Sequence, residues 1–214
     1  TITKLEIAPV DGSYQLAGES VWINGTERTG TYSSGTLTLT GITVPVKPKG
    51  VKVSGIVKSY NPNNATTIQL KQGNTVKYST TIATATGSEQ MEQNFTFEAV
   101  APGTYDLVVT KACHLTYTIK NLVVGDNPLD LMTHTNAAIR TITLLAGDVN
   151  GDGSINAIDL NRVWNAANFN KAVSAAAEKL TDVNGDGMVN AIDLNIVWNA
   201  ANFNKGTGDC TFEY

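Results

Sequence analysis

Cysteine, histidine and long apolar runs are scarce in this sequence of 214 residues. Its two cysteines, Cys113 and Cys210, are too few for a disulfide scaffold or a cysteine zinc site. Its two histidines, His114 and His134, give little material for histidine-dependent catalysis. No apolar run approaches the roughly 20 residues that a membrane-spanning helix needs. The composition therefore argues against an enzyme that depends on these residues and against a membrane protein.

Positive charge is also in short supply. The 15 lysines and arginines face 19 aspartates and glutamates, for a net charge of −4. Nucleic-acid binding usually requires a basic patch, so we expect no nucleic-acid partner. The sequence has no signal-peptide pattern and opens inside a strand-like pattern, so we expect a piece of a longer protein. The apolar fraction of 42% is enough to bury hydrophobic cores, and we expect a folded monomer.

The composition changes along the chain. Residues 1–147 are rich in Thr, Val and Ile with a period of two, which predicts half-buried strands, whereas residues 148–214 are rich in Ala and Asn with helical spacing. Pro45 and Pro48 mark a second break, because proline cannot donate to a sheet ladder. The predicted fold class is mainly β plus a small α domain. The predicted divisions are a β segment or small β module of residues 1–46, a β-sandwich of residues 47–146, an α domain of residues 147–205 and a tail of residues 206–214.

The acidic region contains a nearly perfect internal repeat. Residues 148–170 read DVNGDGSINAIDLNRVWNAANFN, and the same pattern returns 34 positions later in residues 182–204. Of the 23 positions, 20 are identical. The differences are Ser154/Met188, Ile155/Val189 and Arg162/Ile196. Such self-similarity shows that the unit was duplicated.

Each copy fits the spacing of a calcium-binding loop, with D-x-N-x-D-G followed by an aspartate at position 12. Oxygen atoms from alternate positions suit calcium, which takes six to eight oxygen ligands, and Gly153 and Gly187 would make the sharp turn. Position 7 would bind through its backbone carbonyl, so the Ser154/Met188 difference is harmless. The candidate ligands are Asp148, Asn150, Asp152, Ser154, Asn156 and Asp159 in the first loop, and Asp182, Asn184, Asp186, Met188, Asn190 and Asp193 in the second.

The alternative is a pair of Asp/Asn/Gly turns that bind no metal. Three carboxylates held close together repel one another strongly without a counter-ion, and two complete loops make this alternative weak. Magnesium is smaller and retains several waters, so a large set of protein oxygens favours calcium. The sequence therefore predicts two calcium ions.

The repeat resembles a dockerin, the calcium-dependent docking module of cellulosome-like assemblies in polysaccharide-degrading bacteria. The residues before each loop, RTITLLAG and EKLT, do not form the entering helix of an ordinary EF-hand, and a loop followed by one helix is typical of dockerins. The resemblance implies an all-α module with two EF-hand-like calcium loops. It also implies a cohesin of a scaffoldin as the partner, and a secreted, extracellular location at the cell surface.

The helix after each loop has a predicted core stripe of Leu160, Val163 and Ala167, and a second face with Asn161, Trp164, Asn165 and Asn168. Trp164 and Trp198 could be core aromatics or hot-spot residues of an interface. Most dockerins carry polar or charged residues at these two positions. By the resemblance, cohesin contacts map to Ala157, Ile158, Trp164, Asn165 and Phe169, and to Ala191, Ile192, Trp198, Asn199 and Phe203.

The five predicted contact positions are identical in the two repeats. Two such units should pack about a pseudo-two-fold axis, with Leu160 and Val163 buried against Leu194 and Val197. A cohesin would then meet nearly the same chemistry in either of two orientations, with a stoichiometry of one to one. Arg162 against Ile196 is the difference that could bias this choice.

The strand-rich region resembles transthyretin-like, carboxypeptidase-regulatory-like repeats of bacterial surface proteins. The matching features are the turn at Pro102-Gly103 and the following Tyr105 in APGTYDLVVTKACHLTYTIKNLVV. A β module directly before a dockerin is often called an X module, and it can support the dockerin or contact the cohesin. The neighbouring Cys113 and His114 would point to opposite faces of a strand, so a nucleophile pair is not expected.

The implied extracellular location permits a disulfide between Cys113 and Cys210, which would connect the β domain to the tail. The alternative is two unpaired thiols or a bond between chains. For the whole fragment, the leading prediction is a non-catalytic docking module, and a polysaccharide-degrading enzyme is the candidate for its parent protein. The alternatives are a calcium-stabilised stalk and a carbohydrate-binding fragment that uses Tyr14, Trp22 and Tyr32.

Overall fold

The computed structural model describes residues 4–7, 20–23, 26–33, 36–40 and 50–214. The chain divides into two compact units, Thr1–Pro48 and Lys49–Tyr214. The predicted boundary between residues 46 and 47 lies outside the described residues. The predicted boundary between residues 146 and 147 falls within the second unit.

The described residues of the first unit form five short strands. Their bounds are Lys4–Ile7 (β1), Ser20–Ile23 (β2), Thr26–Thr29 (β3), Thr31–Ser33 (β4) and Thr36–Thr40 (β5). Strands β1, β5 and β4 form one antiparallel sheet, and β2 and β3 form a hairpin. Tyr14 lies outside the described residues, as do the side chains of Trp22 and Tyr32. The proposed carbohydrate-binding aromatics are therefore not described by the structure.

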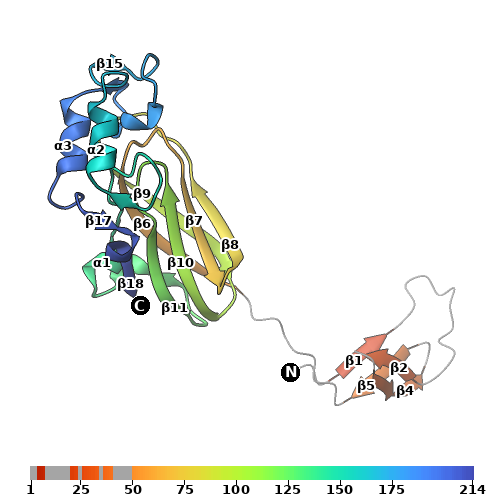
Figure 1. The fold of residues 1–214 in the computed structure, drawn as a ribbon. Coiled ribbons are helices and arrows are strands. Elements are labelled where there is room, and N and C mark those ends of the chain that lie inside the picture. The colour runs from red at the N-terminus through yellow and green to blue at the C-terminus, as the bar shows by residue number, and fades with distance from the viewer. Residues whose placement is uncertain (1–3, 8–19, 24–25, 34–35, 41–49) are drawn as a thin grey trace. The chain divides into compact units, whose positions relative to one another are not determined.

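The second unit begins with a β-sandwich built from two sheets (Figure 1). The first sheet has the strand order β18-β11-β10-β7-β8, and the second has the order β12-β6-β13 with β9 paired to β6. The strands are Val51–Tyr60 (β6), Thr66–Gln72 (β7), Thr75–Ile82 (β8), Gln90–Val100 (β9), Gly103–Lys111 (β10), Tyr117–Val124 (β11), Leu129–Asp130 (β12) and Ile142–Thr143 (β13). Between β12 and β13 lie the 3-10 helix Leu131–Thr133 (η1) and the helix Ala137–Arg140 (α1).

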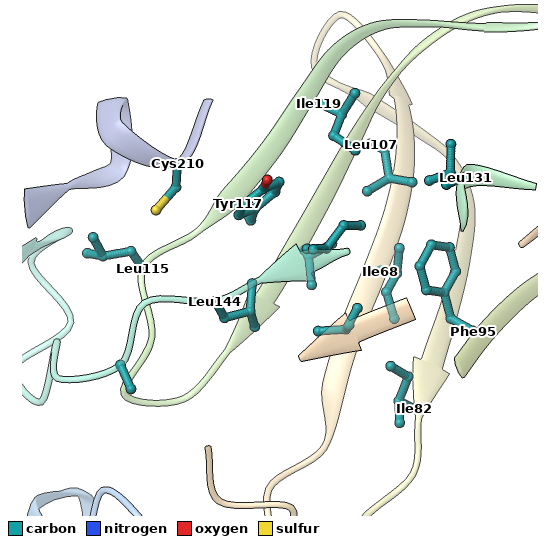
Figure 2. Close-up of a cluster of buried hydrophobic side chains, with 14 of the residues drawn as sticks. Ile68, Ile82, Phe95, Leu107, Leu115, Tyr117, Ile119, Leu131, Leu144 and Cys210 are labelled. Carbon is teal, nitrogen blue, oxygen red and sulfur yellow. The ribbon is translucent and has the colours of Figure 1, made fainter. Parts of the chain in front are cut away.

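Alternation of apolar residues explains the sandwich, because each strand presents one buried face. Ile68 and Leu70 of β7, and Leu107 and Val109 of β10, are fully buried. Phe95 of β9 faces them from the other sheet (Figure 2). The predicted turn lies between β9 and β10, and the buried Tyr105 donates a hydrogen bond of 2.8 Å from its hydroxyl to the Ala101 carbonyl. The prediction of a mostly β chain is confirmed.

The repeat segment, residues 147–205, carries two short helices, Ala157–Trp164 (α2) and Ala191–Trp198 (α3), and the 3-10 helix Lys179–Thr181 (η2). It also contains four two-residue strands: Ser154–Ile155 (β14), Lys171–Ala172 (β15), Met188–Val189 (β16) and Lys205–Gly206 (β17). Each loop pairs with the segment after the other repeat's helix, β14 with β17 and β15 with β16. The all-α prediction for this segment is therefore wrong, because it overlooked this crosswise pairing.

The end of the chain returns to the sandwich. After the 3-10 helix Thr207–Cys210 (η3), strand Thr211–Glu213 (β18) pairs in parallel with β11. The Phe212 ring stacks on Tyr117, with ring centroids 5.0 Å apart. The residues predicted as a tail thus add an edge strand to the sheet. Among the helices of the described residues, none has the length and apolar character required to cross a membrane.

Candidate functional site

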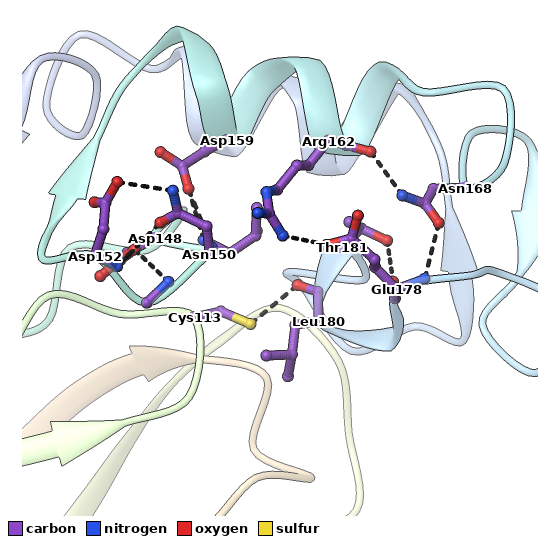
Figure 3. A network of polar contacts seen from close by, with 12 residues as sticks. Cys113, Asp148, Asn150, Asp152, Asp159, Arg162, Asn168, Glu178, Leu180 and Thr181 are labelled. Carbon is purple, nitrogen blue, oxygen red and sulfur yellow. Dashed lines mark hydrogen bonds and ion pairs between the residues drawn. The ribbon is translucent and has the colours of Figure 1, made fainter.

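The first loop is folded around the side chain of Asp148 (Figure 3). Its Oδ1 accepts hydrogen bonds from the amides of Gly151 at 2.8 Å and Asp152 at 3.1 Å, and its Oδ2 accepts one from Gly153 at 3.0 Å. Gly151 and Gly153 have φ angles of +74° and +84°, a backbone region in which only glycine is unstrained. The predicted sharp turn at Gly153 is therefore present.

Asp159 closes the same loop from the start of α2. Its Oδ1 accepts from the amides of Val149 at 3.0 Å and Asn150 at 3.3 Å, while its Oδ2 accepts from Asn156 at 2.9 Å. Asn156 in turn caps the helix by accepting from the Ile158 amide at 2.7 Å. This reciprocal capping box satisfies free amides at the helix start and holds the carboxylate inside the loop.

The second loop repeats this geometry. Asp182 accepts from Gly185 at 2.9 Å and from Gly187 at 3.0 Å, and these glycines have φ angles of +80° and +90°. Asp193 accepts from Val183 at 2.7 Å and caps α3 in the same way as Asp159 caps α2. Ile155 and Val189, at position 8 of the two loops, are fully buried, and these apolar side chains fix the loops to the core.

The loops concentrate negative charge that the protein itself does not neutralise. Burial raises the pKa of Asp148 and Asp182, and it raises the pKa of Asp193 to about 6. None of the ion pairs among the described residues involves these three side chains. A carboxyl with a raised pKa in the folded state lowers folded stability at neutral pH. A divalent cation in each loop would offset this cost.

The donor set suits calcium rather than a softer metal. Within the described residues, no three His, Cys, Asp or Glu side chains form a metal cluster by themselves. The loops instead alternate carboxylates with asparagine side chains and backbone carbonyls, which is the mixed oxygen set of a calcium loop. The structure brings the predicted ligands of each repeat into one loop, so the residues present fit a calcium ion. Their individual roles as ligands remain predictions.

Helices α2 and α3 present a shared apolar surface. Trp164 and Trp198 are 61% and 58% exposed, and Ile158 and Ile192 are 54% and 44% exposed. The two tryptophans flank a groove of about 330 Å³ between the helices. The groove is lined by Leu160, Asn161, Trp164, Leu194, Asn195 and Trp198. The tryptophans are therefore surface residues, and their interpretation as core aromatics is wrong.

The other predicted contact residues do not line this groove, and Asn199 lines a separate pocket with Tyr60 and Gln90 of the sandwich. Ala157, Asn165, Ala191 and Asn199 are exposed, and Phe169 and Phe203 are half-buried. Each phenylalanine packs on its tryptophan, with centroid distances of 4.5 Å for Trp164–Phe169 and 4.4 Å for Trp198–Phe203. This packing fixes the orientation of the exposed indole rings. The structure thus places both tryptophans at the groove, and the roles of the ten predicted contact residues remain predictions.

Two details of the predicted helix faces are wrong, because both helices end at the tryptophan. Ala167 is exposed rather than part of the core stripe, and Asn168 is 1% exposed rather than on the outer face. The Asn168 side chain donates to the Arg162 carbonyl at 2.8 Å and accepts from the Glu178 amide at 2.9 Å. The helical spacing could not apply beyond Asn165, where the backbone turns.

The predicted disulfide is also wrong, because both cysteines are free and buried. Cys113 Sγ lies 2.9 Å from the Leu180 carbonyl oxygen, at the approach to the second loop. Cys210 lies at the end of η3 in the hydrophobic core, near Leu145 and Tyr117. Burial raises the pKa of the Cys113 thiol to about 12 and that of Cys210 to about 11. Both thiols therefore act as small core side chains.

Two asparagines of the sandwich, which the sequence analysis did not identify, contact the second loop. Asn61 donates from its side chain to the Asp182 carbonyl at 3.2 Å, and Asn63 donates to the Gly185 carbonyl at 2.9 Å. The Asn-Pro-Asn-Asn run at residues 61–64 is typical of a turn. Its polar side chains serve the backbone of a segment more than 100 residues away, and no local pattern predicts such contacts.

Comparison with known proteins identifies this architecture. The model of the dockerin type I domain matches residues 146–202. A type II cohesin–X-dockerin complex from Acetivibrio cellulolyticus, mutated at its N-terminal interface, matches with a TM-score of 0.56 and 28% identity over 75% of this chain and 99% of the other. The complex mutated at its C-terminal interface matches with a TM-score of 0.55 and 27% identity over the same shares. No curated protein matches the chain. The chain therefore carries an X module followed by a dockerin domain.

Proposed function

We propose that this chain is a non-catalytic docking fragment that binds a cohesin through the surface formed by α2 and α3. The observation that carries the proposal is the groove between these helices, flanked by two exposed tryptophans. Exposed aromatic side chains beside a groove are typical of interaction surfaces, and tryptophan is enriched at hot spots. The similarity to type II cohesin–X-dockerin complexes supports a type II cohesin as the first partner to test.

The two helices support binding in either of two orientations. Their exposed contact residues are identical, and the single sequence difference within them, Arg162 against Ile196, lies away from the groove residues. Arg162 forms an ion pair of 2.7 Å with Glu178, while Ile196 is 6% exposed. One bound cohesin would cover both halves of the surface, so the expected stoichiometry is one to one.

Calcium is the cofactor of the proposed interaction. Dockerin domains bind calcium, and we assign one ion to each loop with the twelve ligands named above. Each loop leads directly into α2 or α3 through its last aspartate, so an ordered loop fixes the start of a docking helix. We further propose that the fragment works outside the cell, attached to its surface through a scaffoldin, as part of a protein whose own activity lies elsewhere.

Size-exclusion chromatography of the full chain with a purified type II cohesin tests the proposal. In millimolar calcium the two proteins should elute together at one to one, and EGTA should separate them. The double variant Asp148→Ala/Asp182→Ala should stay separate even in calcium. A complex that survives EGTA unchanged would contradict calcium dependence, and separate elution from a panel of type I and type II cohesins in calcium would contradict the docking function.

A further inference from the structure

The X module reaches the second calcium loop through the segment before β9. The amide of Glu89 donates to the Asn184 carbonyl at 3.0 Å, and the Asn184 side-chain amide donates to Glu89 Oε1 at 3.0 Å. Asn63 supports the pair, because its side-chain amide contacts the carbonyls of both Gly87 and Gly185 at 2.9 Å. Residues that lie 95 positions apart thus form a two-point contact beside a predicted calcium ligand.

Both residues of this contact are constrained, Asn184 by burial and Glu89 by its backbone conformation. Asn184 is fully buried, so its amide hydrogens need protein acceptors. Glu89 has a φ angle of +70°, a conformation that costs a non-glycine residue free energy and persists only where the surroundings fix it. The two hydrogen bonds to Asn184 provide that fixation. A residue in a strained conformation therefore stands where its carboxylate meets the loop.

The first loop has no such partner. Asn150, the counterpart of Asn184, donates from its side chain to Asp152 within its own loop at 2.7 Å. Within residues 50–214, the hydrogen bonds of the first loop involve its own residues, its flanks and the segment of residues 204–207, and none reaches the strands or turns of the X module. The two loops share a sequence but differ in this one external carboxylate.

An asparagine at loop position 3 can hold a cation only through its oxygen. The side-chain amide of Asn184 donates toward Glu89 and Asp186, while its Oδ1 accepts from the Asp186 amide inside the loop. Glu89 gives the nitrogen a second acceptor outside the loop, and this added contact helps to hold the side chain with its oxygen directed into the loop. Partners of this kind around a metal ligand typically change metal affinity 10–100-fold when they are lost.

We infer that Glu89 of the X module is a positioning residue of the second calcium loop, so that two modules build this site while the dockerin alone builds the first. The inference rests on the calcium binding contained in the proposed function. If Glu89 has this role, the calcium affinity of the second loop depends on the X module and that of the first loop does not. The residue acts through Asn184 and not as a ligand.

A calcium titration of the full chain, observed by NMR in competition with a chelator of known affinity, tests this. The amides of Gly153 and Gly187 report the two loops separately, because each donates at 3.0 Å to the first aspartate of its own loop. Glu89→Ala should weaken calcium binding at the second loop at least tenfold and leave the first loop within twofold. Glu89→Gln retains an acceptor oxygen and should recover most of the affinity.

Glu98→Ala is the matched control, because Glu98 is an exposed glutamate of β9 in the same module. It should leave both loops within twofold. Unchanged affinity at the second loop in Glu89→Ala, or an equal loss at both loops, would overturn the inference. Failure of the proposed function is distinguishable, because wild-type chain would then bind no calcium at either loop, or would bind calcium without binding a cohesin.

Discussion

The two repeats of the dockerin domain share 20 of 23 residues but lie in different surroundings. The second loop is packed against the X module, and Asn184 within it is fully buried. The first loop is partly open to solvent, with Asn150 half-buried, and its neighbour is the segment around β17. Identical local sequence therefore gives the same loop geometry, while tertiary contacts make the two loops unequal.

The docking helices show the opposite result. Trp164 and Trp198 differ by only three percentage points in exposure, and each packs on its own phenylalanine at nearly the same distance. The X module contacts the second loop and the chain end, and neither tryptophan is among the residues of these contacts. The two Trp–Phe pairs therefore keep a two-fold character, while the two loops do not.

Of the changes considered, removal of calcium should lower the stability of the two loops most. Each ion adds about 4 kcal/mol to the free energy of unfolding when free calcium exceeds the dissociation constant 1,000-fold. Calorimetry and far-UV circular dichroism should show that EGTA lowers the unfolding temperature and removes the helical signal of residues 147–205. An unchanged melting curve in EGTA would show that the loops do not depend on calcium.

Acid should weaken the X module at a buried histidine near the dockerin. Burial of the ring, with a further contribution from the charge of Lys111, lowers the pKa of His114 to about 4 from its ordinary value of 6.5. Nε2 of the ring accepts a hydrogen bond from the Tyr60 amide at 3.1 Å. The unfolded chain therefore binds a proton first, and stability is lost as the pH falls from 6.5 toward 4. The free energy of unfolding should fall by about 3 kcal/mol over this pH range.

His114→Gln should remove this loss while keeping an acceptor for Tyr60. Urea unfolding from pH 7 to pH 4 in saturating calcium should give a flatter stability profile for His114→Gln than for wild type. His134→Gln is the control, because His134 is only half-buried, and its profile should follow wild type. Parallel profiles for wild type and His114→Gln would contradict the assignment.

A matched pair of glycine substitutions should give the smallest effect. Gly151→Ala and Gly185→Ala place the same side chain at equivalent loop positions with positive φ, which costs about 1–2 kcal/mol in either loop. Nothing lies within 4 Å of a Cβ at Gly151, whereas a Cβ at Gly185 would clash with Asn61 and Asn63 of the X module. Gly185→Ala should therefore cost about 1–3 kcal/mol more in chemical denaturation. Equal costs would show that the second loop is not held against the X module.

Much of the site followed from the sequence because it is encoded locally. Ligand spacing, the glycine at loop position 6 and the apolar residue at position 8 act within a dozen residues, so the loops could be predicted from one repeat. The exposure of Trp164 could not be predicted, because helical spacing was compatible with both a core and a surface position. The position of Asn168 was predicted wrongly because the helix ends four residues earlier, at Trp164.

Contacts between distant segments could not be predicted in this way. The pairing of β14 with β17, and the return of β18 to β11, depend on how the repeats pack together and on where the chain end lies. The Cys113–Cys210 prediction failed for the same reason, because it relied on compartment chemistry and not on the position of either thiol. The Glu89–Asn184 contact likewise needs the fold of both modules.

The most direct test of the proposed docking surface is calorimetry of cohesin binding by Trp164→Ala, Trp198→Ala and the double variant. The two-fold surface predicts that each single variant binds with little loss, because the other orientation retains its tryptophan. The double variant should lose far more than the sum of the single losses, since truncation of a central hot-spot residue costs about 2 kcal/mol or more. If one single variant abolishes binding while the other has no effect, the cohesin binds in one fixed orientation and the two-fold account is wrong.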